Sequence, residues 1–380
     1  MSDTPAVERV GTAVFTVPTD APEADGTLAW DSTTLVLATV DSAGVTGLGY
    51  TYAPAATARI VDDLLAGVVT GSPALDVPRM NEAMHRAVRN AGLPGVAAQA
   101  VAAVDIALWD CKARLLGLPL VRLLGAAREK VPVYGSGGFT TYDDDRQERQ
   151  LRGWAEEDGI PRVKIKIAES WGTREDRDRR RVARARAVIG DDTELYVDAN
   201  GGYGAKQAVR VGRALADEGV TWFEEPVSSD HLTTLAAIRA QVPQDVTAGE
   251  YGYTLPYFEH LLAAGAVDCL QADAPLPHCL EGVGGTPSGG LTVWLRAAAL
   301  AQARGLQISG HCAPHAHAHA AAAVPNLRHL EWFHDHVRIE RILFDGTLTP
   351  DGGALTPGAD ATPGLGLTLA PQRAEPYRAA

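Results

Sequence analysis

Three short stretches decide the fold predicted for this chain: ELYVDAN (194–200), TWFEEPV (221–227) and DVTAGE (245–250). Each is a β-like run with an acidic residue near its end, and these residues, Asp198, Glu224 and Glu250, recur at intervals of 26 residues. One strand, a crossover helix and two loops consume about 26 residues, so each repeat returns the chain to the same end of a parallel sheet. We therefore expect the three carboxylates to converge at one end of a parallel barrel.

The chemistry of these three side chains favours magnesium. Carboxylate oxygens are hard ligands, and Mg²⁺ binds a few of them while it keeps positions for water and substrate. Zinc sites usually contain His or Cys, and neither residue type stands at the three positions. The pattern therefore predicts a Mg²⁺ site at the mouth of the barrel.

Length and charge narrow the class of protein. A chain of 380 residues accommodates a barrel of roughly 250 residues and a smaller second domain. It carries 34 Lys and Arg residues against 47 Asp and Glu residues, a net charge of −13. This charge argues against a nucleic-acid partner and against an anionic membrane surface. Small anionic substrates stay compatible with it if local cations and a metal override the overall sign.

Two further features favour a cytoplasmic enzyme. No apolar run approaches the roughly 18 residues of a membrane span, and residues 1–15 lack the pattern of a secretion signal. The four cysteines contain no CxxC pair, so neither a disulfide framework nor a cysteine-rich zinc site is indicated. The cysteines are Cys111, Cys269, Cys279 and Cys312.

The order of predicted elements divides the chain into three parts. Residues 1–128 show strands followed by helices, which is typical of an α+β domain. Residues 129–345 alternate short strands with helices, as a parallel barrel does. Residues 346–380 are rich in turn residues, and we expect them to pack back on the first domain. The predicted fold class is α/β, a modified TIM barrel of the (β/α)₇β type with an N-terminal α+β capping domain.

The barrel region contains eight candidate strands, and eight is a number that closes a barrel. They lie near residues 131–138, 162–167, 194–200, 221–227, 245–250, 267–274, 306–311 and 329–333.

Alternation along these strands turns ionisable side chains inward. In VKIKI, Lys164 and Lys166 share one face, whereas Val163 and Ile165 share the face that helices cover. Two lysines inside a barrel are costly to desolvate unless anions compensate them, so their presence favours a catalytic role. The same alternation turns Asp198, Asp273, His311 and Glu331 inward.

This set of motifs resembles the enolase superfamily and, within it, the mandelate racemase subgroup. The resemblance spans nearly the whole chain and implies Mg²⁺-assisted abstraction of the proton α to a carboxylate. It rests on KIK (164–166), DANGGY (198–203), EEP (224–226), GE (249–250), LQAD (270–273), SGH (309–311), LEWF (330–333) and, upstream, AVDIALWDCKARLLGLPLVRLLG (103–125).

The resemblance assigns a role to each inward residue. Asp198, Glu224 and Glu250 ligate Mg²⁺. Lys166 is one acid/base catalyst, and Lys164 lowers the pKa of Lys166 and helps to hold the substrate carboxylate. His311, oriented by Asp273, is the opposing acid/base catalyst, because a carboxylate behind an imidazole fixes its tautomer. A protonated Glu331 donates to the charge that develops on the substrate.

The resemblance also concerns partners. It implies a small carboxylate substrate, for which Asn200 is a candidate binding residue. It implies a homo-oligomer as well, with an octamer as one candidate state.

Two places depart from the family pattern. A Gly- and Pro-rich stretch at 275–290 delays the turn expected soon after Asp273 and suggests an inserted loop. His315, His317 and His319 follow His311 closely, which resembles a zinc-ligand pattern. We interpret these three as residues of a loop or helix start. Glu225 has the wrong parity for the interior and is expected beside the site or against the helix layer.

The leading functional hypothesis is dehydration of a sugar acid to a 2-keto-3-deoxy acid. The first alternative is a racemase or epimerase of a 2-hydroxy acid, with Lys166 and His311 on opposite faces of one enolate. Cycloisomerisation is less favoured, because it would require a Lys in place of His311. Alternatives of another class are a zinc-dependent barrel hydrolase and a catalytically silent barrel. Specificity should come from residues 16–30 and 275–290, which carry no readable code for a substrate.

Overall fold

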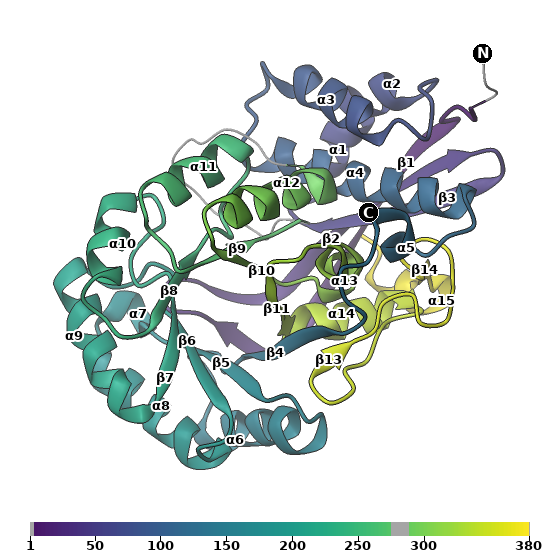
Figure 1. The fold of residues 1–380 in the computed structure, drawn as a ribbon. Helices are drawn as coiled ribbons and strands as arrows, with labels where there is room; N and C mark the ends of the chain where they lie inside the picture. Colours follow the sequence, from purple (N-terminus) through teal and green to yellow (C-terminus); the bar gives the residue numbers. More distant parts are fainter. Residues whose placement is uncertain (1–3, 275–288, 380) are drawn as a thin grey trace.

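The computed structural model describes residues 4–274 and 289–379 of the chain. Figure 1 shows a barrel ringed by helices and, beside it, a smaller part formed by long strands and helices α1 to α4. Among the described residues, no helix is both long enough and apolar enough to cross a lipid bilayer.

A three-stranded antiparallel sheet underlies the capping domain. Its strands are β1 (Arg9–Ala24), β2 (Ala29–Ser42) and β3 (Val45–Tyr52), in that order across the sheet. β2 and β3 form the predicted hairpin, and its two turn residues, Ala43 and Gly44, both have positive φ (48° and 77°). Such a turn matches the twist of the paired strands.

The long helix α4 (Val96–Leu115) lies against β3 because two glycines leave room for it. A Cβ atom on Gly49 would lie 2.3 Å from the carbonyl oxygen of Ala103, and one on Gly47 would lie 2.3 Å from that of Ala107. The other capping elements are α1 (Ala56–Ile60), a π-helical turn (Val61–Leu65), α2 (Ala66–Val69) and α3 (Val77–Val88), and α5 (Leu120–Leu124) leads into the barrel.

Eight parallel strands close the barrel, since each pairs with the next and β11 pairs with β4. All eight predicted strands are confirmed. The strands are β4 (Val131–Gly137), β5 (Arg162–Lys166), β6 (Glu194–Asp198), β7 (Val220–Glu224), β8 (Asp245–Ala248), β9 (Cys269–Ala272), β10 (Gln307–Gly310) and β11 (Leu327–Phe333).

Helices connect these strands on the outside of the barrel (Figure 1). The predicted insertion at 275–290 falls almost wholly on residues 275–288, which lie outside the described residues. The helices are α6 (Asp144–Arg152) with a π-helical turn (Gly153–Glu157), α7 (Glu169–Gly172), α8 (Glu175–Ile189), α9 (Ala205–Leu215) with a 3₁₀ turn (Ala216–Glu218), α10 (Leu232–Arg239), α11 (Leu255–Ala263), α12 (Gly290–Ala303), α13 (Pro314–Ala323) and α14 (His334–Leu343).

The barrel interior is layered. Buried aromatic rings fill its amino-terminal half, where Tyr196 and Trp222 stack with ring centroids 5.4 Å apart and Tyr134 and His329 pack against them. Two residues further along β6, β7 and β11, the same inner face becomes charged. The pairs are Tyr196 and Asp198, Trp222 and Glu224, and His329 and Glu331.

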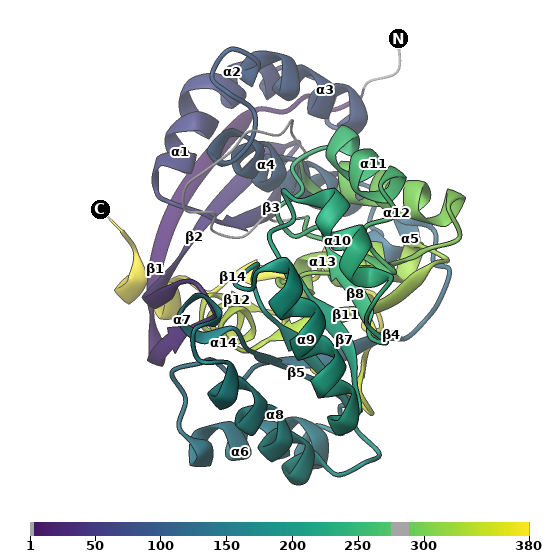
Figure 2. The same ribbon diagram turned by 90° about the vertical axis from the view of Figure 1, so that its left-hand side faces the viewer.

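The capping domain reaches the charged end of the barrel. The turn between β1 and β2 meets the loops after β4 and β5, where the Thr140 N–H donates to the Ala24 carbonyl (2.8 Å) and the Trp171 N–H to the Gly26 carbonyl (2.8 Å). Figure 2 shows β1 and β2 running from helices α1 to α3 down to the barrel. The capping strands therefore lie beside the barrel end that carries the predicted site.

The C-terminal segment contacts both parts of the molecule. Its strand β13 (Ala354–Leu355) pairs with β4, and β14 (Thr368–Leu369) pairs with β12 (Phe344–Asp345). The Ala379 N–H donates to the Val14 carbonyl (2.8 Å) on β1 of the capping domain. The remaining elements are α15 (Pro371–Ala374) and a 3₁₀ turn (Glu375–Tyr377).

Candidate active site

Two buried lysines on β5 organise the charged layer. Lys164 Nζ lies 2.5 Å from Glu224 Oε1, 2.8 Å from Glu331 Oε1 and 3.7 Å from Asp198 Oδ2. Lys166 Nζ donates to Asp198. Both side chains point inward, as the alternation along VKIKI predicted.

The charge state of Lys166 differs from the expectation. Burial lowers the pKa of Lys166, and the positive charge of Lys164 lowers it further. The carboxylates of Asp198, Glu250 and Glu224 outweigh both effects and raise the pKa of Lys166 above its ordinary value. The predicted influence of Lys164 is therefore present, although it does not decide the outcome. In this arrangement the lysine holds its proton at neutral pH.

The three predicted metal ligands gather beside the lysines. Asp198 contacts Glu224, and the carboxylates of Glu224 and Glu250 present ligand atoms within 4.8 Å of each other. Burial raises the pKa values of Glu224 and Glu250, and so does the negative charge of Asp198. Asp198 behaves differently, because Lys166 and Lys164 overcome the effect of burial and lower its pKa.

Glu225 follows β7 directly and lies beside the site. It is buried, and its acidic neighbours are Glu250, Asp198 and Glu224, whose charges add to burial in raising its pKa. The cause is local backbone geometry: β7 ends at Glu224, and Glu225 has a left-handed φ of 36° that breaks the alternation. The parity argument placed it beside the site or against the helix layer, and its acidic neighbours support the first of these positions.

These donors fit a magnesium ion. Four carboxylates, those of Asp198, Glu224, Glu225 and Glu250, crowd into a buried space, and three of them have raised pKa values. Glu250 Oε2 is buried and accepts no hydrogen bond from any described residue. A divalent cation would relieve this crowding, and a donor set dominated by carboxylate oxygens suits Mg²⁺.

His311 and Asp273 form the predicted pair at the ends of β10 and β9. His311 Nδ1 lies 3.1 Å from Asp273 Oδ2, and His311 Nε2 lies 3.4 Å from Glu250 Oε2. Burial lowers the pKa of His311, but Glu250, Glu331 and Asp273 raise it more, to about 9. At neutral pH the imidazole is therefore protonated and able to act as an acid.

Glu331 on β11 accepts several hydrogen bonds and is ionised. Its Oε1 accepts from Ser136 Oγ (2.6 Å), and its Oε2 accepts from the Cys312 N–H (3.0 Å). Burial raises the pKa of Glu331, but Lys164 and then His311 hold it well below the ordinary value. The expectation of a protonated Glu331 is wrong for this arrangement, because Lys164 lies against its carboxylate.

Asn200 follows Asp198 in a tight turn. It has a left-handed φ of 44°, and its backbone N–H donates to Asp198 Oδ1 (2.9 Å). Its side-chain oxygen is buried and accepts no hydrogen bond from the described residues. The residue therefore lies beside the site, and its role in binding substrate stays a prediction.

The three histidines after His311 have separate partners. His315 contacts Glu340, and His319 accepts from the Val121 N–H (3.1 Å) and donates to the Leu365 carbonyl (3.2 Å). His317 lies behind Asp273, with its Nε2 3.7 Å from Asp273 Oδ1. Among the described residues, no group of three or more potential metal ligands within 4.8 Å of one another includes any of the three. They belong to a buried helix, α13, which disfavours the zinc reading.

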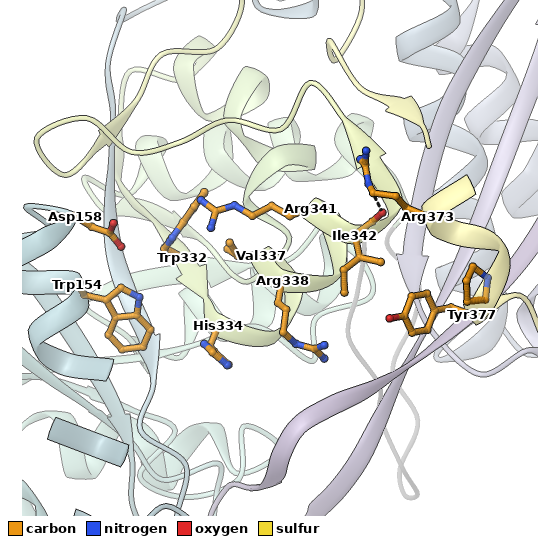
Figure 3. Close-up of a pocket in the computed structure, with 11 residues that line it drawn as sticks. Trp154, Asp158, Trp332, His334, Val337, Arg338, Arg341, Ile342, Arg373 and Tyr377 are labelled. Carbon is orange, nitrogen blue, oxygen red and sulfur yellow. Dashed lines mark hydrogen bonds between the residues drawn. The ribbon is translucent and has the colours of Figure 1, made fainter. Parts of the chain in front are cut away.

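A cavity of about 690 Å³ lies apart from these residues. Figure 3 shows its wall of α14 side chains and the aromatic rings of Trp154 and Trp332. Its arginines already have partners: Arg338 pairs with Asp335 and Arg373 with Asp345, while Arg341 lies over the Trp332 ring. None of the predicted site residues lines this cavity.

Sequence reasoning missed residues whose positions depend on non-local contacts. Tyr134 OH lies 3.4 Å from Lys164 Nζ and accepts from Gln271 Nε2 (3.0 Å). Cys312 holds Glu331 through its N–H, and its Sγ lies 3.4 Å from His311 Nε2. Tyr134 and Gln271 have inward parity, which is the one signal that could have identified them.

Comparison with known proteins identifies the family of this chain. The family model of the mandelate racemase / muconate lactonizing enzyme N-terminal domain matches residues 9–125, and the enolase C-terminal domain-like model matches residues 146–373. A solved mandelate racemase/muconate lactonizing enzyme-like protein from Rubrobacter xylanophilus is 49% identical, with a TM-score of 0.92 over 99% of this chain and 100% of that chain.

Two curated relatives are enzymes. The L-talarate/galactarate dehydratase of Salmonella typhimurium is 31% identical over 317 residues, 80% of this chain and 75% of the relative. A variant of this dehydratase, solved with Mg and L-glucarate, has a TM-score of 0.89 at 27% identity, covering 100% of this chain and 93% of that chain. The 3,6-anhydro-alpha-L-galactonate cycloisomerase of Streptomyces coelicolor is 32% identical over 335 residues, 86% of this chain and 88% of the relative. The chain belongs to the mandelate racemase / muconate lactonizing enzyme family of the enolase superfamily.

Proposed function

We propose that this protein is a Mg²⁺-dependent lyase that dehydrates a sugar acid to a 2-keto-3-deoxy acid. The observation that carries the proposal is the arrangement around Glu250. Lys166 on β5 and His311 after β10 both act electrostatically on this carboxylate, from different strands of the barrel wall. A substrate beside Glu250 would therefore have a proton acceptor and a proton donor within reach.

Asp198, Glu224 and Glu250 would hold the magnesium ion. When bound, the ion supplies positive charge that stabilises the enolate form of the substrate carboxylate. The structure of an L-talarate/galactarate dehydratase variant with Mg and L-glucarate supports this assignment. Asn200, beside Asp198, is the residue that we assign to substrate binding.

Lys166 would take the α-proton. It acts in its neutral form, so it must first lose the proton that the surrounding carboxylates stabilise. Lys164 stays charged between Glu224 and Glu331 and lowers the energy of the negative charge that develops on the substrate. Glu331, as an ionised acceptor, fixes the position of Lys164.

His311 would expel the β-hydroxyl. Its imidazolium form, which its raised pKa maintains at neutral pH, gives a proton to the departing oxygen as the bond between carbon and oxygen breaks. Water leaves, the electron pair of the former C–H bond becomes the new double bond, and the resulting enol rearranges to the 2-keto acid. Asp273 holds the imidazole at Nδ1, so that Nε2 faces the substrate.

A panel assay tests the proposal. The purified protein with Mg²⁺ is incubated with sugar acids, including L-talarate, galactarate and L-glucarate, and 2-keto acid is measured. Formation of keto acid from at least one of them, absent in Lys166→Ala, supports the proposal. Failure with the whole panel, together with inversion of an α-centre, would replace it with the epimerase reading.

Cycloisomerisation is a second candidate, because a curated cycloisomerase aligns with 86% of this chain. The presence of His311 where a lysine was expected for that reaction is therefore a weaker counterargument than the sequence suggested. Including 3,6-anhydro-alpha-L-galactonate in the panel distinguishes the two: its conversion without turnover of the open-chain acids favours the cycloisomerase.

A further inference from the structure

We propose that His317 is a positioning residue for the acid/base pair, one imidazole that ties together the two chain segments carrying Asp273 and His311. The inference rests on the proposed function for its catalytic meaning, whereas the geometry of the tie can be tested without a substrate. His317 is fully buried on α13, seven residues after β10 ends at Gly310. The proposed mechanism assigns it no step.

The two ring nitrogens of His317 reach both segments. Nε2 accepts a hydrogen bond from the Ala274 N–H (2.8 Å), and Ala274 directly follows Asp273. Nδ1 lies 3.1 Å from the carbonyl oxygen of Cys312, which directly follows His311, and 3.1 Å from that of Ala313. One side chain therefore links the residues next to both members of the pair.

These partners fix the tautomer of His317. A backbone N–H can only donate and a backbone carbonyl can only accept, so Nε2 carries the lone pair and Nδ1 carries the proton. The Asp273 carboxylate, whose Oδ1 lies 3.7 Å from Nε2, opposes this state because its negative charge favours a protonated ring. Burial, as the largest influence, lowers the pKa of His317, and a neutral ring is what both contacts require.

The segment after His311 depends on such a restraint. Cys312 and Ala313 both have left-handed backbone angles, with φ values of 49° and 38°. Residues other than Gly, Asn and Asp rarely adopt this region, and they do so where the surroundings impose it. The hydrogen bonds from His317 Nδ1 to both carbonyls hold this turn, and the turn determines where the His311 ring lies.

His319 provides a matched control within the same helix. It too is buried, accepts from a backbone N–H (Val121, 3.1 Å) and reaches a backbone carbonyl (Leu365, 3.2 Å). Its partners belong to α5 and to the C-terminal segment, and neither adjoins the acid/base pair. A general loss of packing would affect both histidines, whereas a positioning role belongs to His317 alone.

The experiment compares His317→Leu, His317→Gln and His319→Leu in the full-length, Mg²⁺-loaded protein. Two rates are measured with a substrate found in the panel: formation of keto acid, and exchange of the α-proton in deuterated water. Displacing His311 by about 1 Å costs about 100-fold in its step. His317→Leu should therefore lower keto-acid formation by about 100-fold while exchange, which Lys166 drives, stays within a few fold.

The other two variants complete the prediction. His317→Gln should recover most of the lost turnover, because its oxygen can accept from Ala274 and its amide can donate to Cys312. His319→Leu should leave the ratio of the two rates unchanged. Equal ratios in His317→Leu and His319→Leu, or no recovery in His317→Gln, would overturn the proposal.

A structural readout separates this inference from the proposed function. Crystal structures of the His317 variants give the distance between His311 Nδ1 and Asp273 Oδ2, which is 3.1 Å in the native chain. We expect this contact to be lost in His317→Leu and kept in His317→Gln, whatever the substrate proves to be. An unchanged contact in His317→Leu would contradict the positioning role. If His317→Leu does not fold, His317→Asn, which is too short to span both partners, replaces it under the same criteria.

Discussion

The barrel interior has an aromatic lower layer, at the amino-terminal ends of the strands, and a charged upper layer at their carboxyl ends. The two layers differ in chemistry although the same strands supply both and both are buried. Tyr196 and Trp222 form the aromatic layer, and two residues further along the same strands Asp198 and Glu224 form the charged layer. Burying a ring is favourable, whereas burying a carboxylate costs free energy unless a cation compensates it. One pleat of the sheet therefore separates residues that stabilise the fold from residues that serve the chemistry.

Substitutions in the two layers should affect activity and stability in opposite ways, and this is the largest effect that we expect. Glu250→Gln should lower activity by about 100-fold or more, because it removes a charge aimed at the reacting groups. Its free energy of unfolding should stay the same or rise, since the change relieves repulsion among buried carboxylates. Steady-state kinetics and urea unfolding measure the two quantities.

Tyr196→Ala is the counterpart in the aromatic layer. It should lower the free energy of unfolding by about 3–5 kcal/mol, as do other deletions of large buried rings. The activity per folded molecule should change much less than in Glu250→Gln. A variant of Glu250 that unfolds at lower urea concentration than Tyr196→Ala would contradict this division of roles.

Magnesium should stabilise the upper layer specifically. At a concentration 100 times its dissociation constant, an ion that binds only the folded state adds about 2.7 kcal/mol to the free energy of unfolding. We expect thermal unfolding to shift upward with Mg²⁺ and back with a chelator, and activity to follow. Asp198→Ala should abolish the shift, and Tyr196→Ala should keep it, which is the outcome that distinguishes the layers.

His311 makes stability depend on pH. Its folded-state pKa of about 9 is above the value of about 6.5 expected in an unfolded chain. Its contribution is therefore fully present below pH 6.5 and is lost as the pH rises through 9. In the presence of a chelator, the difference in unfolding free energy between the native chain and His311→Asn should shrink over this range. A difference that stays constant from about pH 6 to 9.5 would speak against the raised pKa.

The smallest effect concerns the outer cavity. Arg341→Ala should change the free energy of unfolding by less than about 0.5 kcal/mol and leave the turnover rate nearly unaltered. The reason is that Arg341 is exposed and contacts Trp332 on the outside of the barrel. A large loss of turnover would show that the chemistry is not confined to the charged layer.

Much of this arrangement could be predicted from sequence because it follows from two regular spacings of residues. The repeat of 26 residues placed the strands, and the alternation within each strand turned Lys164, Lys166 and Asp198 inward. Both rules hold as long as the backbone is regular. The eight strands and the closed barrel are accordingly confirmed.

The prediction was incomplete where the backbone departs from strand geometry. Thr247 faces inward on β8, yet Glu250, with the opposite parity, also reaches the site, because Gly249 has a φ of 133°. Glu225 turns toward the site for a similar reason. Glycine at 249 was a readable signal of irregular backbone, whereas nothing in the local sequence marked the left-handed Glu225.

Charge states could not be predicted from sequence either. The ionised state of Glu331 depends on Lys164, which comes from a strand that is distant in sequence. The separate partners of His315, His317 and His319 depend likewise on segments from the rest of the chain. Such contacts are properties of the folded arrangement, so spacing in the sequence alone could not show them.

The most direct test of the central claim, that Lys166 removes the α-proton and His311 expels the hydroxyl, follows one substrate in deuterated water with three proteins. The native protein should form keto acid. His311→Asn should form none while it still exchanges the α-proton, because Lys166 can remove and return it from one face, and Lys166→Ala should do neither. Exchange that persists in Lys166→Ala, or keto acid formed by His311→Asn at the native rate, would contradict the account.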